Sequence, residues 1–163
     1  MTVTESGPQP GTLLDRWSRF ERLPAGRLLF SIALGWQIPY SGTIGARVLE
    51  LKPGHARLSL ADRRRVRNHL NSIHAVALVN LGELATGLAV FSTTGATMRG
   101  ILVDIRAEYL KKARGRLEAE ADFQLPDKLE DNTPCEVQAR IRDAEGDTVS
   151  VVSATWLIGC RQS

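Results

Sequence analysis

The chain has 163 residues, of which 43% are apolar and 24% charged, a balance typical of one soluble globular domain. Lys and Arg number 21 against 18 Asp and Glu, giving a net charge of +3. This mild excess can attract a phosphorylated ligand but does not indicate a nucleic-acid-binding protein. Two cysteines and three histidines, without ligand spacing, argue against a disulfide framework and against a zinc site. We expect reduced thiols, no structural metal and no cofactor.

Two apolar stretches resemble membrane or export segments in composition. Residues 75–91 include Glu83, and placing them in lipid would bury a carboxylate in hydrocarbon. Residues 28–36 resemble a signal-peptide core, but three acidic residues precede them and they lie late in the chain. We therefore expect a cytoplasmic protein with no membrane insertion.

The N-terminal part divides into a tail and a helical extension. Residues 1–11 hold two prolines, two glycines and few apolar side chains, which predicts a disordered tail. Residues 12–38 form an extension of two short helices: the first begins near a capping pattern at Thr12, and the second covers residues 26–38 and ends at Pro39.

The remaining residues, 39–163, predict one domain of the α+β class. From Ile44 the apolar period becomes two, and Pro53 with Gly54 predicts the turn of a hairpin. A buried helix rich in small residues follows over 73–91. Four further strands are predicted over residues 100–110, 116–123, 135–142 and 148–158. This order predicts an antiparallel curved sheet of about six strands wrapped around one long central helix, whose exposed edges favour a dimer or a dimer of dimers.

Glu83 is the most unusual residue of the predicted buried helix. A charged, unpaired carboxylate is unstable in an apolar helix, so we expect Glu83 to be protonated, hydrogen-bonded or kept for chemistry with a raised pKa. Asn80 and Thr86 lie at helical spacing from it and are candidate partners. Catalysis and simple satisfaction of the carboxylate both remain open.

The start of the same helix offers a second element. Free N–H groups near His74, Ala75 and Val76 carry the positive end of the helix dipole and can hold a developing oxyanion. His74 is either an orienting residue or a structural cap, and Asn68 either positions a ligand or bonds its own loop.

Residues 44–160 resemble the hotdog-fold acyl-CoA thioesterases, in the phenylacetyl-CoA thioesterase-like branch and an uncharacterised sister family of unknown function. In that branch an Asn precedes, by six or so residues, a His-Gly-Gly that opens the central helix, and an acidic residue follows nine positions after the His. Asn68, His74 and Glu83 fall at these spacings. The segment 103–115 is similar to the branch's later strand and basic turn.

The resemblance implies an acyl-CoA hydrolase whose site forms across a dimer interface. Glu83 would act as general base or nucleophile, the Ala75 N–H would stabilise the oxyanion, and Asn68 would position the thioester or the attacking water. Coenzyme A enters only as part of the substrate. The residues implied for its phosphates are Lys111, Lys112, Arg114 and Arg99 or Arg106.

The chain departs from the branch at three positions. Ala75 and Val76 replace the two glycines, and Leu102 stands where active relatives often carry Ser or Thr. These differences keep a second hypothesis open, a non-catalytic hotdog protein that binds an acyl-CoA or a fatty acyl group.

Other notable residues are assigned no site. The arginines at 63, 64, 65 and 67 are interpreted as a solvated loop, with a coenzyme A contact left open; a nucleic-acid partner is not expected, since aromatic residues make up only 6% of the chain. Large aromatic residues are expected in the core or in dimer contacts, and both cysteines are interpreted as small apolar core residues. The aromatic residues concerned are Trp17, Trp36, Trp156 and Tyr109.

Overall fold

The computed structural model describes residues 13–94 and 98–160. The predicted tail over residues 1–11 and the predicted cap at Thr12 lie outside this range. The helices are α1 (Leu13–Glu21), α2 (Gly26–Gln37), α3 (Pro39–Gly42) and α4 (Ala75–Thr93), with a 3₁₀ turn η1 (Arg64–Val66). The strands are β1 (Arg47–Lys52), β2 (His55–Leu60), β3 (Met98–Tyr109), β4 (Leu117–Asp122), β5 (Thr133–Arg142) and β6 (Thr148–Cys160).

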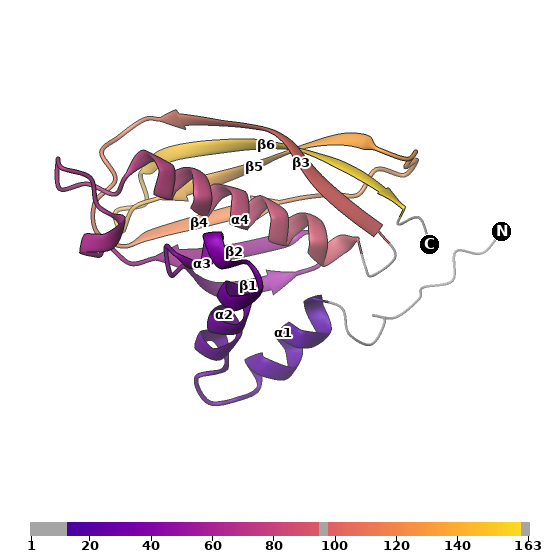
Figure 1. Cartoon of the computed structure of the whole chain (residues 1–163), viewed down its shortest axis with the longest axis horizontal. Helices are drawn as coiled ribbons and strands as arrows, with labels where there is room; N and C mark the ends of the chain where they lie inside the picture. The colour runs from indigo at the N-terminus through magenta and orange to yellow at the C-terminus, as the bar shows by residue number, and fades with distance from the viewer. Residues whose placement is uncertain (1–12, 95–97, 161–163) are drawn as a thin grey trace.

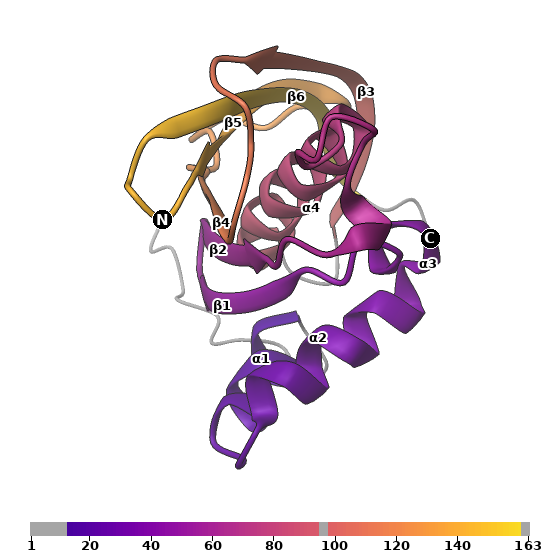
Figure 2. The ribbon, with the colours of Figure 1, turned by 90° about the vertical axis from the view of Figure 1, so that its left-hand side faces the viewer.

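The six strands form one antiparallel sheet in the order β1-β2-β4-β5-β6-β3. The sheet curls around α4, as Figures 1 and 2 show from two directions. Strand β3 follows α4 in the chain yet pairs with β6, so it closes the sheet at the edge opposite β1. The predicted hotdog architecture is thereby confirmed.

Helix α4 is the core of the molecule because it is apolar on nearly every side. It is the one helix of the described chain long and apolar enough to span a membrane, but 72% of its apolar window is buried inside the protein. A Cβ atom at Gly82 would overlap the side chain of Val152, and one at Gly87 would lie 3.2 Å from the Trp156 ring. The small residues therefore allow the sheet to approach the helix closely.

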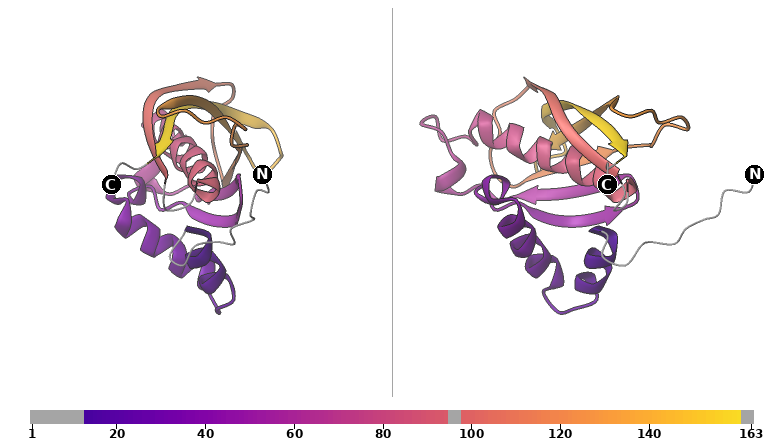
Figure 3. Two further views of the ribbon diagram at one scale, coloured as in Figure 1. Left: turned by 90° about the vertical axis from the view of Figure 1, so that its right-hand side faces the viewer. Right: turned by 45° about the vertical axis from the view of Figure 1, so that its right-hand side comes forward.

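The N-terminal helices lie beside the β1 edge, away from β3 (Figure 3). The rings of Trp17 in α1 and Phe30 in α2 meet edge to face at 5.0 Å. The Ser31 hydroxyl of α2 accepts a hydrogen bond from the Val48 N–H at 3.0 Å, which fastens α2 to β1. Pro39 ends α2 as predicted and also opens α3, since proline is well suited to the first position of a helix.

Burial follows the predicted alternation along the strands, and most of the large aromatic residues and cysteines can be compared with their predicted places. Cys135 is buried, whereas Cys160 is exposed because it is the last residue of β6; both thiols are free. Trp17 and Trp156 are in the core, but Trp36 is 84% exposed. The core prediction was therefore wrong for Cys160. Trp36 and Tyr109, which is 50% exposed, lie outside the core, and dimer contacts stay the prediction for these two.

Candidate functional site

Glu83 lies in the middle of α4, where α3 packs against that helix. The Ser41 hydroxyl of α3 donates a hydrogen bond to Glu83 Oε2 across 3.4 Å, and Ser41 is itself buried. No Lys, Arg or His nitrogen of residues 13–94 and 98–160 lies within ion-pair distance of the Glu83 carboxylate. The carboxylate is thus held by one long hydrogen bond and no cation.

Burial dominates the acidity of this group. Removal from water raises the pKa of Glu83, and the hydrogen bond from Ser41 partly opposes that rise. A carboxyl group with a raised pKa is better matched to proton transfer near neutral pH than an ordinary surface carboxylate. The predicted raised pKa therefore agrees with the environment of Glu83.

The two predicted partners of Glu83 serve other groups. The Thr86 hydroxyl donates to the main-chain oxygen of Glu83 at 3.0 Å and accepts from Trp156 Nε1 at 3.3 Å. Asn80 Nδ2 donates to the Tyr40 carbonyl at 3.4 Å. Asn80 Oδ1 is buried without a donor among the described residues, so an unused acceptor lies one helical turn from the carboxylate.

The start of α4 has the geometry of a capped helix. His74 Nδ1 accepts from the Val76 N–H at 3.1 Å, so His74 is the structural cap that the sequence allowed. The Ala75 N–H has no acceptor among the residues the structure describes. The Ala75 carbonyl accepts from the Tyr109 hydroxyl at 3.4 Å. One free donor therefore remains at the positive end of the helix.

Glu83 and the helix start do not meet within one protomer. Glu83 follows Ala75 by eight positions, which at 1.5 Å per residue is about 12 Å along the helix axis. A reacting carbonyl cannot contact both groups across that distance. The predicted site is therefore incomplete in a single chain.

Asn68 lies in the loop before α4 and is bonded within it. Its Oδ1 accepts from the N–H groups of Leu70 and Ser72 at 2.9 and 3.2 Å, and from the Ser72 hydroxyl at 3.3 Å. This is the local bonding that the sequence left open as an alternative. Asn68 shapes the loop that delivers the chain to the start of α4.

The four basic residues predicted for coenzyme A are not gathered in one place. Lys111 Nζ contacts carboxylate oxygens of Asp143, Glu145 and Asp147 at 2.8, 3.1 and 2.7 Å, and these contacts raise the pKa of Lys111. Arg99, at the other end of β3, donates to Asn132 at 2.8 Å. The length of β3 places roughly 35 Å between Arg99 and Lys111.

Lys112 and Arg114 lie near the start of α4. The connection between β3 and β4 that contains them bonds to the residue before His74: the Ile73 N–H donates to the Ala113 carbonyl at 2.8 Å. Both side chains are exposed. Of the predicted basic set, these two remain beside the helix start.

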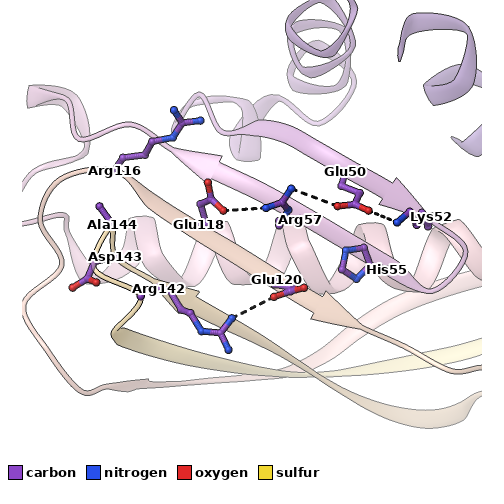
Figure 4. Close-up of a pocket in the computed structure, with 11 residues that line it drawn as sticks. Glu50, Lys52, His55, Arg57, Arg116, Glu118, Glu120, Arg142, Asp143 and Ala144 are labelled. Carbon is purple, nitrogen blue, oxygen red and sulfur yellow. Dashed lines mark hydrogen bonds and ion pairs between the residues drawn. The ribbon is translucent and has the colours of Figure 1, made fainter. Parts of the chain in front are cut away.

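A broad hollow of about 990 Å³ lies on the face of the sheet turned away from α4 (Figure 4). Its charges neutralise one another: Arg57 pairs with Glu118 at 3.5 Å, and Arg142 pairs with Glu120 at 3.3 Å. No apolar residue larger than Ala144 lines it. This hollow is a solvated charged surface. It lacks the apolar lining that an acyl group would need and an unpaired group that could act on a thioester.

Two smaller openings lie where α2 and α3 meet the body of the protein. The narrower one is lined by Ser41 and Leu84, among others, and reaches the partner of Glu83. The wider one, of about 550 Å³, is open to the surface and lined by Trp36 and three arginines. The α2-α3 pair therefore lies between Ser41 and the wider opening, and the narrower gap of about 30 Å³ has room for about one water molecule.

Comparison with known proteins places the chain in a family. The domain of unknown function DUF4442 matches residues 26–158. The chain belongs to the DUF4442 family. No curated protein matches it significantly.

Solved structures similar to this DUF4442 protein share its fold. A crystal structure described only as a genomics target is 29% identical, with a TM-score of 0.77 over 90% of this chain and 97% of that chain. A protein of unknown function from Pseudomonas aeruginosa, described as a probable thioesterase, is 22% identical with a TM-score of 0.74, over 85% of this chain and 97% of that one. A thioesterase from Haemophilus influenzae is 20% identical with a TM-score of 0.65, over 74% of this chain and 82% of that one.

Ser41 is the residue of this site that the sequence analysis missed. It lies at the boundary drawn between the helical extension and the sheet domain, in a stretch with no recognisable motif. Pro39, which favours the first position of a helix, is the available sign that a further turn begins there. The contact between Ser41 and Glu83 joins residues 42 positions apart and depends on how α3 packs on α4.

Proposed function

We propose that this DUF4442 protein is a thioesterase-like hydrolase that cleaves an acyl-CoA thioester with Glu83 as its acidic residue. The observation that carries the proposal is the half-buried carboxylate without a cation, held only by the Ser41 hydroxyl. Perturbed carboxylates of this kind concentrate at functional sites. The similar structures described as thioesterases support the reaction class.

In the proposed reaction Glu83 acts as general base. It takes a proton from a water molecule while the water oxygen bonds to the thioester carbon, and the carbonyl oxygen becomes an oxyanion. The free Ala75 N–H at a helix start is suited to hold that oxyanion. The carbon–sulfur bond then breaks, and the proton on Glu83 passes to the departing thiolate.

The two groups are proposed to come from different protomers. Since about 12 Å separates Glu83 from Ala75 along one helix, Glu83 of one copy would work with the Ala75 N–H of the other. The β3 edge is unpaired on one side and exposes Ile101 and Val103, which suits it to self-association in a dimer or a dimer of dimers. Light scattering coupled to size exclusion would report a monomer if this assembly does not form.

Nothing in this reaction requires a cofactor, and we propose that the protein acts in the cytoplasm. Burial of α4 inside the sheet supports a protein that works without membrane insertion.

A non-catalytic acyl-binding protein is the second candidate, favoured by one observation. Val76 is 53% exposed at the start of α4, next to the free Ala75 N–H and at a position where the thioesterase branch that the chain resembles carries a glycine without a side chain. Such a protein would bind acyl-CoA without releasing thiol.

Thiol release separates the two candidates. The purified protein would be incubated with short, long and aromatic acyl-CoA thioesters beside E83Q. Hydrolysis that falls at least about a hundredfold in E83Q supports the proposed function, provided that acyl-CoA still raises the melting temperature of the variant. Binding without thiol release in both proteins would establish the second candidate instead.

A further inference from the structure

An open cleft between α2, α3 and the segment before η1 combines positive charge with apolar surface. Its charged lining residues are Arg47, Arg63 and Arg65. Its apolar side is formed by Leu28, Ile32 and Trp36, which lie four residues apart along one stripe of α2. The cleft is thus suited to a ligand that carries anionic and apolar groups together.

Two of the arginines converge on one point of the backbone. Gly45 has a φ of +66°, and a Cβ atom there would overlap the guanidinium of Arg65. Arg63 Nη1 lies 3.9 Å from the same point. The left-handed, side-chain-free residue therefore makes room for two guanidinium groups side by side.

These two charges have no acidic partner. No carboxylate of residues 13–94 and 98–160 forms an ion pair with Arg63 or Arg65, whereas the nearby Arg67 is paired with Asp62 at 2.6 Å. Like charges held close together repel, and a phosphate group between two guanidinium forks relieves that repulsion with charge-assisted hydrogen bonds. The arrangement fits a phosphoanion.

Trp36 indicates what accompanies the phosphate. Its side chain is 84% exposed, although an indole ring is usually mostly buried. A flat heterocycle can stack on such a ring while its phosphates reach the arginines. The ligand chemistry is therefore that of a phosphorylated nucleotide.

The cleft also adjoins the surroundings of Glu83. It shares Ser31, Gly35, Gly42, Gly45 and Ala46 with the narrower gap that Ser41 lines. Ser41 in turn donates its hydroxyl to Glu83. The narrower gap measures about 30 Å³, which is room for about one water molecule, so the cleft adjoins the surroundings of Ser41 but the substrate arm would have to reach Glu83 outside this gap.

We propose that Arg63 and Arg65, with Trp36, bind the phosphorylated nucleotide end of the thioester substrate in this cleft. The identity of the ligand as coenzyme A rests on the proposed function, whereas the phosphoanion site rests on the arginines alone. The site lies on α2 and at η1. It does not include Lys111, which already forms ion pairs with three carboxylates.

The test compares R63Q/R65Q with R64Q in the full-length protein. Arg64 belongs to the same exposed segment but does not line the cleft, so R64Q controls for the general loss of positive charge. Calorimetry with coenzyme A should show Kd rising about tenfold or more in R63Q/R65Q and less than about twofold in R64Q. The KM for an acyl-CoA should rise by a similar factor with kcat unchanged, because the arginines do not touch the reacting carbon.

Further ligands identify the source of the phosphate. ADP, 3′-dephospho-coenzyme A, pantetheine and inorganic phosphate would be titrated into the same three proteins. If the wild type binds coenzyme A but not pantetheine, and R63Q/R65Q no longer binds coenzyme A, the cleft binds the nucleotide end of the substrate. If ADP binds as tightly as coenzyme A and its binding also depends on the two arginines, the site is supported with a free nucleotide as its ligand.

The proposed phosphoanion site and the proposed hydrolase activity can be refuted independently of each other. Arginine-dependent binding of coenzyme A in a protein that releases no thiol would retain the site and overturn the hydrolase. Unchanged Kd and KM in a folded R63Q/R65Q, equal weakening in R64Q, or no binding of any phosphorylated ligand would overturn the site.

Discussion

The two sides of the sheet use charge in opposite ways. On the face turned away from α4, acidic and basic side chains alternate across neighbouring strands and pair, as with Arg57 and Glu118 at 3.5 Å (Figure 4). On the side where α4 meets α3, a single carboxylate, Glu83, has one hydroxyl partner and no cation. The outer face holds far more charge, yet its charges are already neutralised.

The difference shows that an unbalanced charge marks a site better than a dense cluster of charges. Paired surface ions contribute little free energy and leave no group free for a ligand. An unpaired carboxylate withdrawn from water is less stable until a ligand or proton arrives, and two guanidinium groups held close together without an acid repel each other. Glu83 and the Arg63-Arg65 pair are two such places, and both adjoin the α2-α3 pair.

Removing the Ser41 hydroxyl should have the largest effect among changes that leave Glu83 itself in place. In S41A the carboxylate loses its one hydrogen-bond donor, so the pKa of Glu83 rises further. We expect thiol release to fall about tenfold near pH 6 and less near pH 8.

The control for Ser41 is S41T, which keeps the hydroxyl and should restore the rate–pH curve of the wild type. A uniform loss of rate at every pH in S41A would show that Ser41 only supports packing. Rates of both variants would be recorded from pH 5 to 9.

The pH dependence of stability should reveal the same carboxylate. A raised native pKa means that the folded protein binds more protons than the unfolded chain at pH values between the two pKa values. Glu83 therefore favours folding below its ordinary pKa of 4.5, and that contribution is lost as the pH rises through the raised value. Denaturant unfolding at pH 4.5 and pH 8 should show E83Q gaining stability relative to the wild type at the higher pH.

A stability difference between E83Q and the wild type that does not change with pH would contradict the buried-carboxylate account. E120Q is the matched control, because Glu120 on the outer face is paired with Arg142 and accessible to water.

The outer face should give the smallest effects. A double-mutant cycle with E120Q and R142Q is expected to yield a coupling energy of about 0.2–1 kcal/mol that shrinks in high salt. Thiol release should be unchanged in all three variants. A coupling energy of several kcal/mol, or a loss of turnover, would contradict the view that the charges of the outer face are neutralised and play no part in the reaction.

The fold was predictable because its signals are local. The alternation in β4 and the continuous apolar surface of α4 are visible in short windows. The strand order was not predicted, because β3 pairs with β6 rather than with a strand next to it in the chain. Glu83 was also predictable, since a carboxylate in an apolar helix is conspicuous in the sequence alone.

The neighbours of those residues were not predictable from local patterns. Lys111 is neutralised by carboxylates 32 to 36 residues away, and Ser41 reaches Glu83 only because α3 packs on α4. The convergence of Arg63 and Arg65 depends on the left-handed backbone at Gly45. Such pairings are set by tertiary packing, which a run of like charges in the sequence does not reveal.

The most direct test of the central claim is a comparison of thiol release from an acyl-CoA by wild type, E83Q and E120Q under single-turnover conditions. Both variants lose one carboxylate, one from the unbalanced site and one from the neutralised outer face. We predict a loss of at least about a hundredfold in E83Q and a wild-type rate in E120Q. Equal rates in wild type and E83Q would contradict the assignment of Glu83 as the catalytic acidic residue.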